Sequence, residues 1–139
     1  MTGNRTTSPR RPPWPAGGLM LTTILMSILG SGGCNPTARP SDPGEGRKAL
    51  QATLEAWKGG EKPEALAGRS PSIHVSDGDW KSGLLLKSYR ADDEGRLIGS
   101  DLSYSVALEL KNSRGKLVKK NAVYAVTTHP QLLVFRQDD

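Results

Sequence analysis

The chain has 139 residues, of which 19 are lysine or arginine and 14 are aspartate or glutamate, giving a formal net charge of +5. Three of the arginines precede Gly33, so the residues after it carry 16 basic and 14 acidic side chains and are nearly neutral. That balance excludes the concentrated positive charge that nucleic-acid binding needs. One cysteine excludes an intramolecular disulfide, and the length predicts a single small domain.

The first 33 residues have the order of a secretory signal peptide. An apolar run of 11 residues extends from Leu19 to Leu29, and the small residues Ser-Gly-Gly then lead to Cys34. A membrane-spanning helix needs about 18 or more apolar residues, so the run predicts a cleaved signal rather than a span. The basic head before it contains no acidic residue and holds Arg5, Arg10 and Arg11.

These residues resemble the signal of a bacterial lipoprotein, whose lipobox is an aliphatic residue, two small residues and a cysteine. Gly32, Gly33 and Cys34 match that pattern, and Ser31 stands where leucine is usual. The resemblance implies a lipid on Cys34, export, and anchorage in the cell envelope, at the outer membrane or the periplasmic face rather than in the cytoplasm. Asn35 resembles the residue that follows the cysteine in outer-membrane-directed lipoproteins.

Residues 35–46 are predicted to be a flexible tether between the lipidated cysteine and a domain over 47–139. They include Pro36, Pro40 and Pro43, and no apolar side chain larger than that of Ala38. Such a segment cannot bury enough surface to offset the entropy lost when it becomes ordered.

The segment from Arg47 to Lys58 is predicted to be the main helix. Its apolar residues recur at helical spacing on one face, and Gly59 and Gly60 supply a stop. One further helical turn is predicted from Pro63 to Gly68. The face predicted to pack on the domain consists of Leu50, Thr53, Leu54 and Trp57.

The segment 70–83 is polar and rich in turn-forming residues, with Ile73 and Val75 as a short extended piece at most. Four strands are predicted after it, at 84–90, 102–111, 117–128 and 132–136, joined by turns at 92–95 and 112–115 and by a break at 129–130. In the second strand apolar and polar residues alternate most regularly. Its predicted inner row is Leu102, Tyr104, Val106, Leu108 and Leu110.

One main helix followed by about four strands predicts an α+β domain, in which a curved antiparallel sheet packs one face on the helix. This element order resembles cystatin-like and nuclear-transport-factor-2-like folds. The resemblance covers about residues 48–136 and implies a sheet wrapped around a helix. No catalytic motif of those families accompanies it.

The densest group of polar side chains is His74, Asp77 and Asp79, with Trp80 beside them. A histidine and two carboxylates can line a ligand pocket, hold a divalent metal or exchange protons with a substrate. The alternative is a structured loop, because Ser76, Asp77 and Gly78 are ordinary turn residues. That alternative is favoured, and neither a metal site, a cofactor nor a catalytic residue is predicted.

Five cations within ten residues surround the turn at 112–115 and are a candidate contact for an anionic surface. They are Lys111, Arg114, Lys116, Lys119 and Lys120. Their partner would be lipid head groups, an anionic polymer or an envelope protein, and the lack of interleaved aromatic residues disfavours nucleic acid. The alternative, that these lysines keep a sheet edge soluble and unpaired, is favoured.

The leading hypothesis is therefore a membrane-anchored envelope lipoprotein whose domain binds or scaffolds a partner without catalysis. The alternative is a small enzyme or small-ligand carrier of the nuclear-transport-factor-2-like type. It would use a pocket between helix and sheet, with His74, Asp77 or Asp79 at the mouth. A filled space between Trp57 and the sheet would disfavour that alternative.

Overall fold

The computed structural model describes residues 10, 12–13 and 38–137 of the chain. Its contacts divide the chain into two units, Met1–Asn35 and Pro36–Asp139. The predicted lipid site Cys34 lies outside the described residues, together with nearly all of the predicted signal peptide and residues 35–37 of the predicted tether. All described helices and strands belong to the second unit.

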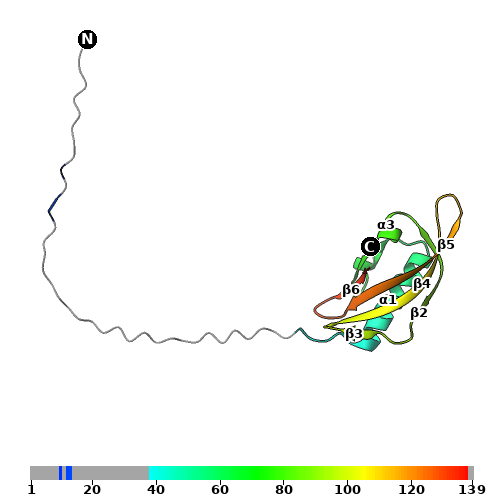
Figure 1. The fold of residues 1–139 in the computed structure, drawn as a ribbon, viewed down its shortest axis with the longest axis horizontal. Coiled ribbons are helices and arrows are strands. Elements are labelled where there is room, and N and C mark those ends of the chain that lie inside the picture. Colours follow the sequence, from blue (N-terminus) through cyan, green and yellow to red (C-terminus); the bar gives the residue numbers. More distant parts are fainter. Residues whose placement is uncertain (1–9, 11, 14–37, 138–139) are drawn as a thin grey trace, which may run out of the picture. The chain divides into compact units, whose positions relative to one another are not determined.

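The described residues of this unit form three helices and a six-stranded curled sheet (Figure 1). The helices are α1 (Pro43–Lys58), α2 (Pro63–Ala67) and α3 (Gly78–Lys81). The strands are β1 (Ile73–Ser76), β2 (Leu85–Ala91), β3 (Arg96–Ile98), β4 (Asp101–Lys111), β5 (Leu117–Thr127) and β6 (Leu132–Arg136). The predicted α+β class with one main helix is confirmed. The sheet contains the four predicted strands and two additional short ones, β1 and β3.

The main helix begins at Pro43, four residues before the predicted start at Arg47. The Asp42 side chain accepts a hydrogen bond from the backbone N–H of Glu45 at 2.7 Å, and proline occupies the first turn. Both are favourable at a helix N-terminus, because aspartate satisfies a free donor and proline lacks the N–H that would be unpaired. Residues 43–46 therefore belong to the helix, and their assignment to a flexible tether was wrong.

Hydrogen bonds also fasten the chain just before this helix. The backbone N–H of Ser41 donates to the Ser100 carbonyl at 2.9 Å, and the Ser41 hydroxyl oxygen accepts from the backbone N–H of Thr128 at 3.0 Å. The Thr128 hydroxyl oxygen accepts in turn from the backbone N–H of Asp42 at 2.9 Å. The folded domain thus begins at Ser41, and six residues, 35–40, separate it from Cys34.

The strands lie in the order β1-β6-β5-β4-β2, and β3 pairs with β4 beyond the end of β2. The β4–β5 hairpin is the longest pairing, and Gly115 takes the positive φ of 79° predicted for its turn. The β1–β6 pair is parallel, whereas the sequence predicted only antiparallel neighbours. Two parallel strands need a long connecting segment. Here that segment contains α3 and the strands β2 to β5.

One face of the sheet forms the core with α1. The predicted inner row of β4, from Leu102 to Leu110, is buried throughout, and so are Leu50, Leu54 and Trp57 on the helix. The helical periodicity and the strand alternation therefore identified both sides of the core correctly. Trp57 donates its indole N–H to the Leu84 carbonyl at 2.8 Å, which satisfies its one polar atom.

Two glycines of α1 test where this helix begins. A Cβ atom added to Gly46 would lie 2.5 Å from Cδ1 of the buried Leu102, whereas one added to Gly44 would lie 3.4 Å from the Asp42 side chain. We expect Gly46→Ala to destabilise the domain by about 1–3 kcal/mol through overpacking. Gly44→Ala should stabilise it by about 0.5–1 kcal/mol, because alanine favours helix.

Urea unfolding followed by tryptophan fluorescence measures both changes. Equal, negligible effects of the two substitutions would mean that residues 43–46 are not part of a packed helix.

Candidate functional site

The predicted polar loop around Asp77 folds as a helical turn. Asp77 precedes α3, and its side chain accepts a hydrogen bond from the backbone N–H of Trp80 at 2.9 Å. Trp80 stacks on Trp57 with 5.4 Å between ring centroids, and its indole N–H donates to the Glu61 carbonyl at 2.9 Å. The interpretation of this segment as structured, with Trp80 packed on the domain, agrees with these contacts, although the helical turn itself was not predicted.

Both aspartates of the predicted group are held by residues of β5 and β6. Asp77 is fully buried and accepts a hydrogen bond from the Tyr124 hydroxyl. Asp79 accepts from Nζ of Lys120 at 2.8 Å and from Nη1 of Arg136 at 2.5 Å, and Arg136 also lies 3.9 Å from Asp77. We call these five residues the aspartate cluster. It contains two carboxylates and two cations, so its formal charge is balanced.

The charge state of Asp79 follows from these contacts. Burial opposes ionisation of its carboxyl group, but the hydrogen bonds and charges of Lys120 and Arg136 outweigh burial and hold its pKa below the ordinary value of 3.8. The carboxylate is therefore ionised at neutral pH and already occupied by two donors. A group in this state is poorly suited to general acid–base chemistry, which needs a pKa near the working pH.

His74 does not join the aspartate cluster. It lies on β1 between the buried Ile73 and the half-buried Val75, and its own side chain is exposed. Successive side chains of a strand point to opposite faces, so His74 points away from the face on which Asp77 meets Tyr124. Within residues 38–137, no three histidine, cysteine, aspartate or glutamate side chains are grouped so that they could hold a metal ion.

Clefts of about 530 Å³, lined by Trp57 and Trp80, and of about 550 Å³, lined by Ala49, Ile73 and Leu132, border α1 among the described residues. A smaller cleft lies between α1 and β2. Its volume is about 280 Å³, its rim includes Arg47, Tyr89 and Asp92, and neither His74 nor the aspartates line it. Leu54 and Trp57 are buried in the same apolar cluster as the inner strand residues. Side chains therefore fill the space directly between Leu54 and the inner face of the sheet, whereas a cleft remains beside Trp57 and Trp80, and neither His74, Asp77 nor Asp79 lines it.

The five predicted basic residues separate into two groups. Arg114 and Lys116 are exposed at the turn between β4 and β5, where the Asn112 side chain accepts from their backbone N–H groups at 3.0 and 2.9 Å. Lys111 and Lys119 project from the sheet face opposite the core. Lys120 instead points to the core face and binds Asp79. Four of the five cations therefore remain for an external partner.

Two exposed leucines flank these cations and were not predicted as part of a site. Lys111 pairs with Leu85 of β2 on one side and with Leu117 of β5 on the other, so the three side chains form one cross-strand row. Leu85 and Leu117 are 51% and 54% exposed. We call the row, together with the three neighbouring cations, the hairpin end: Leu85, Lys111, Leu117, Arg114, Lys116 and Lys119.

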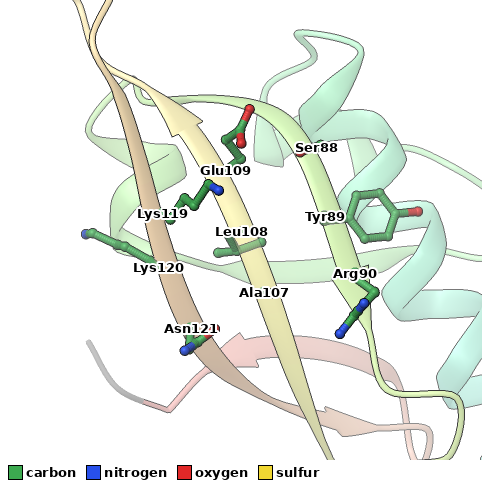
Figure 2. A pocket seen from close by; sticks show the side chains of 9 residues that line it. All are labelled: Ser88, Tyr89, Arg90, Ala107, Leu108, Glu109, Lys119, Lys120 and Asn121. Carbon is green, nitrogen blue, oxygen red and sulfur yellow. The ribbon is translucent and has the colours of Figure 1, made fainter.

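A hollow of about 490 Å³ continues the hairpin end along the outer face of the sheet (Figure 2). Glu109 and Lys119 lie opposite each other on β4 and β5, and Arg90 and Asn121 lie further along it. On this face the lining offers the donors of Arg90, Lys119 and Asn121 and one acidic acceptor, Glu109, beside Ala107. Such a surface can bind an extended chain that carries anionic and hydroxyl groups.

Comparisons of the chain with protein-family models, curated proteins and solved structures found no match. The resemblance to cystatin-like and nuclear-transport-factor-2-like folds therefore stays a prediction from element order. No helix among the described residues is long and apolar enough to cross a membrane.

The lowered pKa of Asp79 predicts how stability depends on pH. Because the folded-state pKa lies below the unfolded value of 3.8, ionised Asp79 stabilises the fold fully above pH 3.8 and loses this effect as pH falls through the folded-state pKa. Asp79→Asn should therefore lower the free energy of unfolding at pH 6, and this difference from the wild type should shrink between pH 4 and pH 2.

Urea titrations across this pH range measure the difference, and Asp92→Asn, at an exposed turn, is the matched control. A difference that stays constant with pH would refute the role of the ionised carboxylate.

Proposed function

We propose that this protein is a cell-envelope lipoprotein, anchored through lipid on Cys34, whose domain binds a partner without catalysing a reaction. The residues that support export and anchorage are the basic head, the apolar run Leu19–Leu29 and the Gly-Gly-Cys sequence at 32–34. The folded domain begins seven residues after Cys34, at Ser41. A lipid on this cysteine would thus hold the domain close to the bilayer.

The arrangement of titratable residues favours binding over catalysis. His74 and the two aspartates, the residues with the most suitable side chains for catalysis, lie on opposite faces of the sheet. Asp79 is paired with two cations, and Asp77 caps α3. The contacts of the two aspartates identify them as stabilising residues, so we do not extend the proposal to a pocket enzyme.

The hairpin end is the surface that we propose for the partner. Its four cations attract negative charge, and its two exposed leucines offer apolar contact that water disfavours. Surfaces that combine both features bind anionic amphiphilic or polymeric partners. We propose an anionic polymer of the envelope, because the adjoining hollow of Figure 2 extends the same surface along the sheet.

Intact mass tests the anchorage. The full-length gene expressed in a bacterium should yield, after detergent extraction of membranes, a chain that begins at Cys34 and carries the added mass of a diacylglycerol. Cys34→Ser should abolish the added mass and release the protein from the membrane fraction. Ser31→Leu, which supplies the usual lipobox residue, should keep both. A mature chain without lipid mass would refute the anchorage.

Charge reversal tests the hairpin end. Arg114, Lys116 and Lys119 are exposed, and changing all three to glutamate leaves Lys120 in place for Asp79. At about 1 kcal/mol for each cation near an anionic surface, the lost attraction should weaken binding about 100-fold at low salt. Heparin serves as the probe, a model anionic polymer, and affinity is measured at two salt concentrations.

The matched control changes three exposed lysines elsewhere to glutamate: Lys48, Lys58 and Lys62. It has the same net charge as the test variant, so only a local site distinguishes the two. Equal losses in both variants would show a general charge effect and refute a binding site at the hairpin end.

A further inference from the structure

The β3–β4 turn exposes two adjacent large apolar side chains. Leu97 is 50% and Ile98 is 56% exposed, and Gly99 and Ser100 follow them at the tip. Leu97 pairs with the buried Leu102 and Ile98 pairs with Asp101, so the two side chains point to opposite faces of the sheet. Apolar surface therefore lies on both sides of this tip.

The chain enters the domain beside this turn. Ser41, the first buried residue of the domain, donates its backbone N–H to the carbonyl of Ser100 at 2.9 Å. In Figure 1, the cyan start of the domain and β3 lie at one end of the sheet, and the loop that joins β4 and β5 lies at the other. β4 runs between these ends over 11 residues, which is about 35 Å at the usual rise of a strand.

We propose that Leu97 and Ile98 insert into the interface of the bilayer that holds the lipid on Cys34, so that the hairpin end faces away from that bilayer. This inference rests on the proposed lipidation. The seven steps of chain from Cys34 to Ser41 reach at most about 25 Å, and Ser41 is fixed next to the turn. The tip is therefore the exposed apolar surface that the anchor brings nearest to the membrane.

The charges near the turn decide what kind of contact this is. Asp92, Asp93 and Glu94 are exposed on the preceding turn, Arg47 pairs with Asp93, and Arg96 is exposed at the start of β3. This end of the domain is not basic, so anionic head groups would not attract it. Insertion depends on the apolar side chains and on the tether, and it should occur equally well in neutral lipid.

A spin label at either end of the domain tests this orientation. In the lipidated protein the only native cysteine is blocked, so Leu97→Cys and Leu117→Cys each introduce one free thiol. The two sites are matched in exposure, at 50% and 54%, but lie at opposite ends of the sheet. Each labelled full-length protein is placed in phosphatidylcholine vesicles, and the nitroxide is exposed to oxygen, which concentrates in lipid, or to a water-soluble nickel chelate.

The label at position 97 should be relaxed more strongly by oxygen than by the nickel chelate, and the label at 117 should show the reverse. Adding Ile98→Asp to the position 97 variant should move that label into water. Aqueous exposure at both positions, or lipid exposure only at 117, would overturn the inference while leaving lipidation intact. A mass without lipid on the wild-type chain would instead refute the proposed anchorage, and this inference with it.

Discussion

Asp79 accepts hydrogen bonds from Lys120 on β5 and from Arg136 on β6, and this interaction joins three parts of the domain that are far apart in sequence. Arg136 is almost fully buried, so its charge needs a partner. Asp79 supplies one, while Asp77 accepts from Tyr124 and caps α3. The position of α3 in turn fixes Trp80, whose ring stacks on Trp57 of the main helix.

These polar contacts therefore hold α3 over the part of the sheet's inner face that the apolar residues of α1 do not cover. Near its middle, the inner face of the sheet is covered by Leu50 and Leu54 of α1. Towards the β4–β5 loop, the inner positions of β5 and β6 are occupied by Lys120 and Arg136 instead, and α3 covers them with its aspartates. Every buried side-chain polar atom in the described residues has a partner, which is what a charged residue at a core position requires.

The sequence predicted the parts of the fold that have a local cause. Alternation identified β4, because one of its faces is buried along its whole length and the other is not. Helical spacing identified α1, but the capping signal of Asp42 and Pro43 was read as tether, since proline and glycine are common in both. The pairing of β1 with β6 has no local signal, because the two strands are far apart in the sequence.

The candidate sites were less predictable for the same reason. Asp77 and Asp79 were grouped with His74 because they are close in sequence. In the structure the two aspartates lie on the core face of the sheet, whereas His74 lies on the opposite face. One signal was available for Arg136: it follows Leu132 and Val134 at a spacing of two, which places it on the inner face. Leu85 gave no signal, because it lies within a run of three leucines, whose periodicity identifies no face.

The surfaces at the two ends of β4 differ in charge, so the two ends of the domain are suited to different contacts. One end joins the chain from residue 40 and exposes apolar side chains among acidic ones; the other exposes cations and two leucines. A long flexible tether would let either end meet a membrane. If Cys34 carries the proposed lipid, the six residues between it and Ser41 are short, and the rigid sheet would set most of the distance between the lipid and the hairpin end. The domain would then act as a spacer about as long as its central strand, which holds the proposed binding surface away from the bilayer.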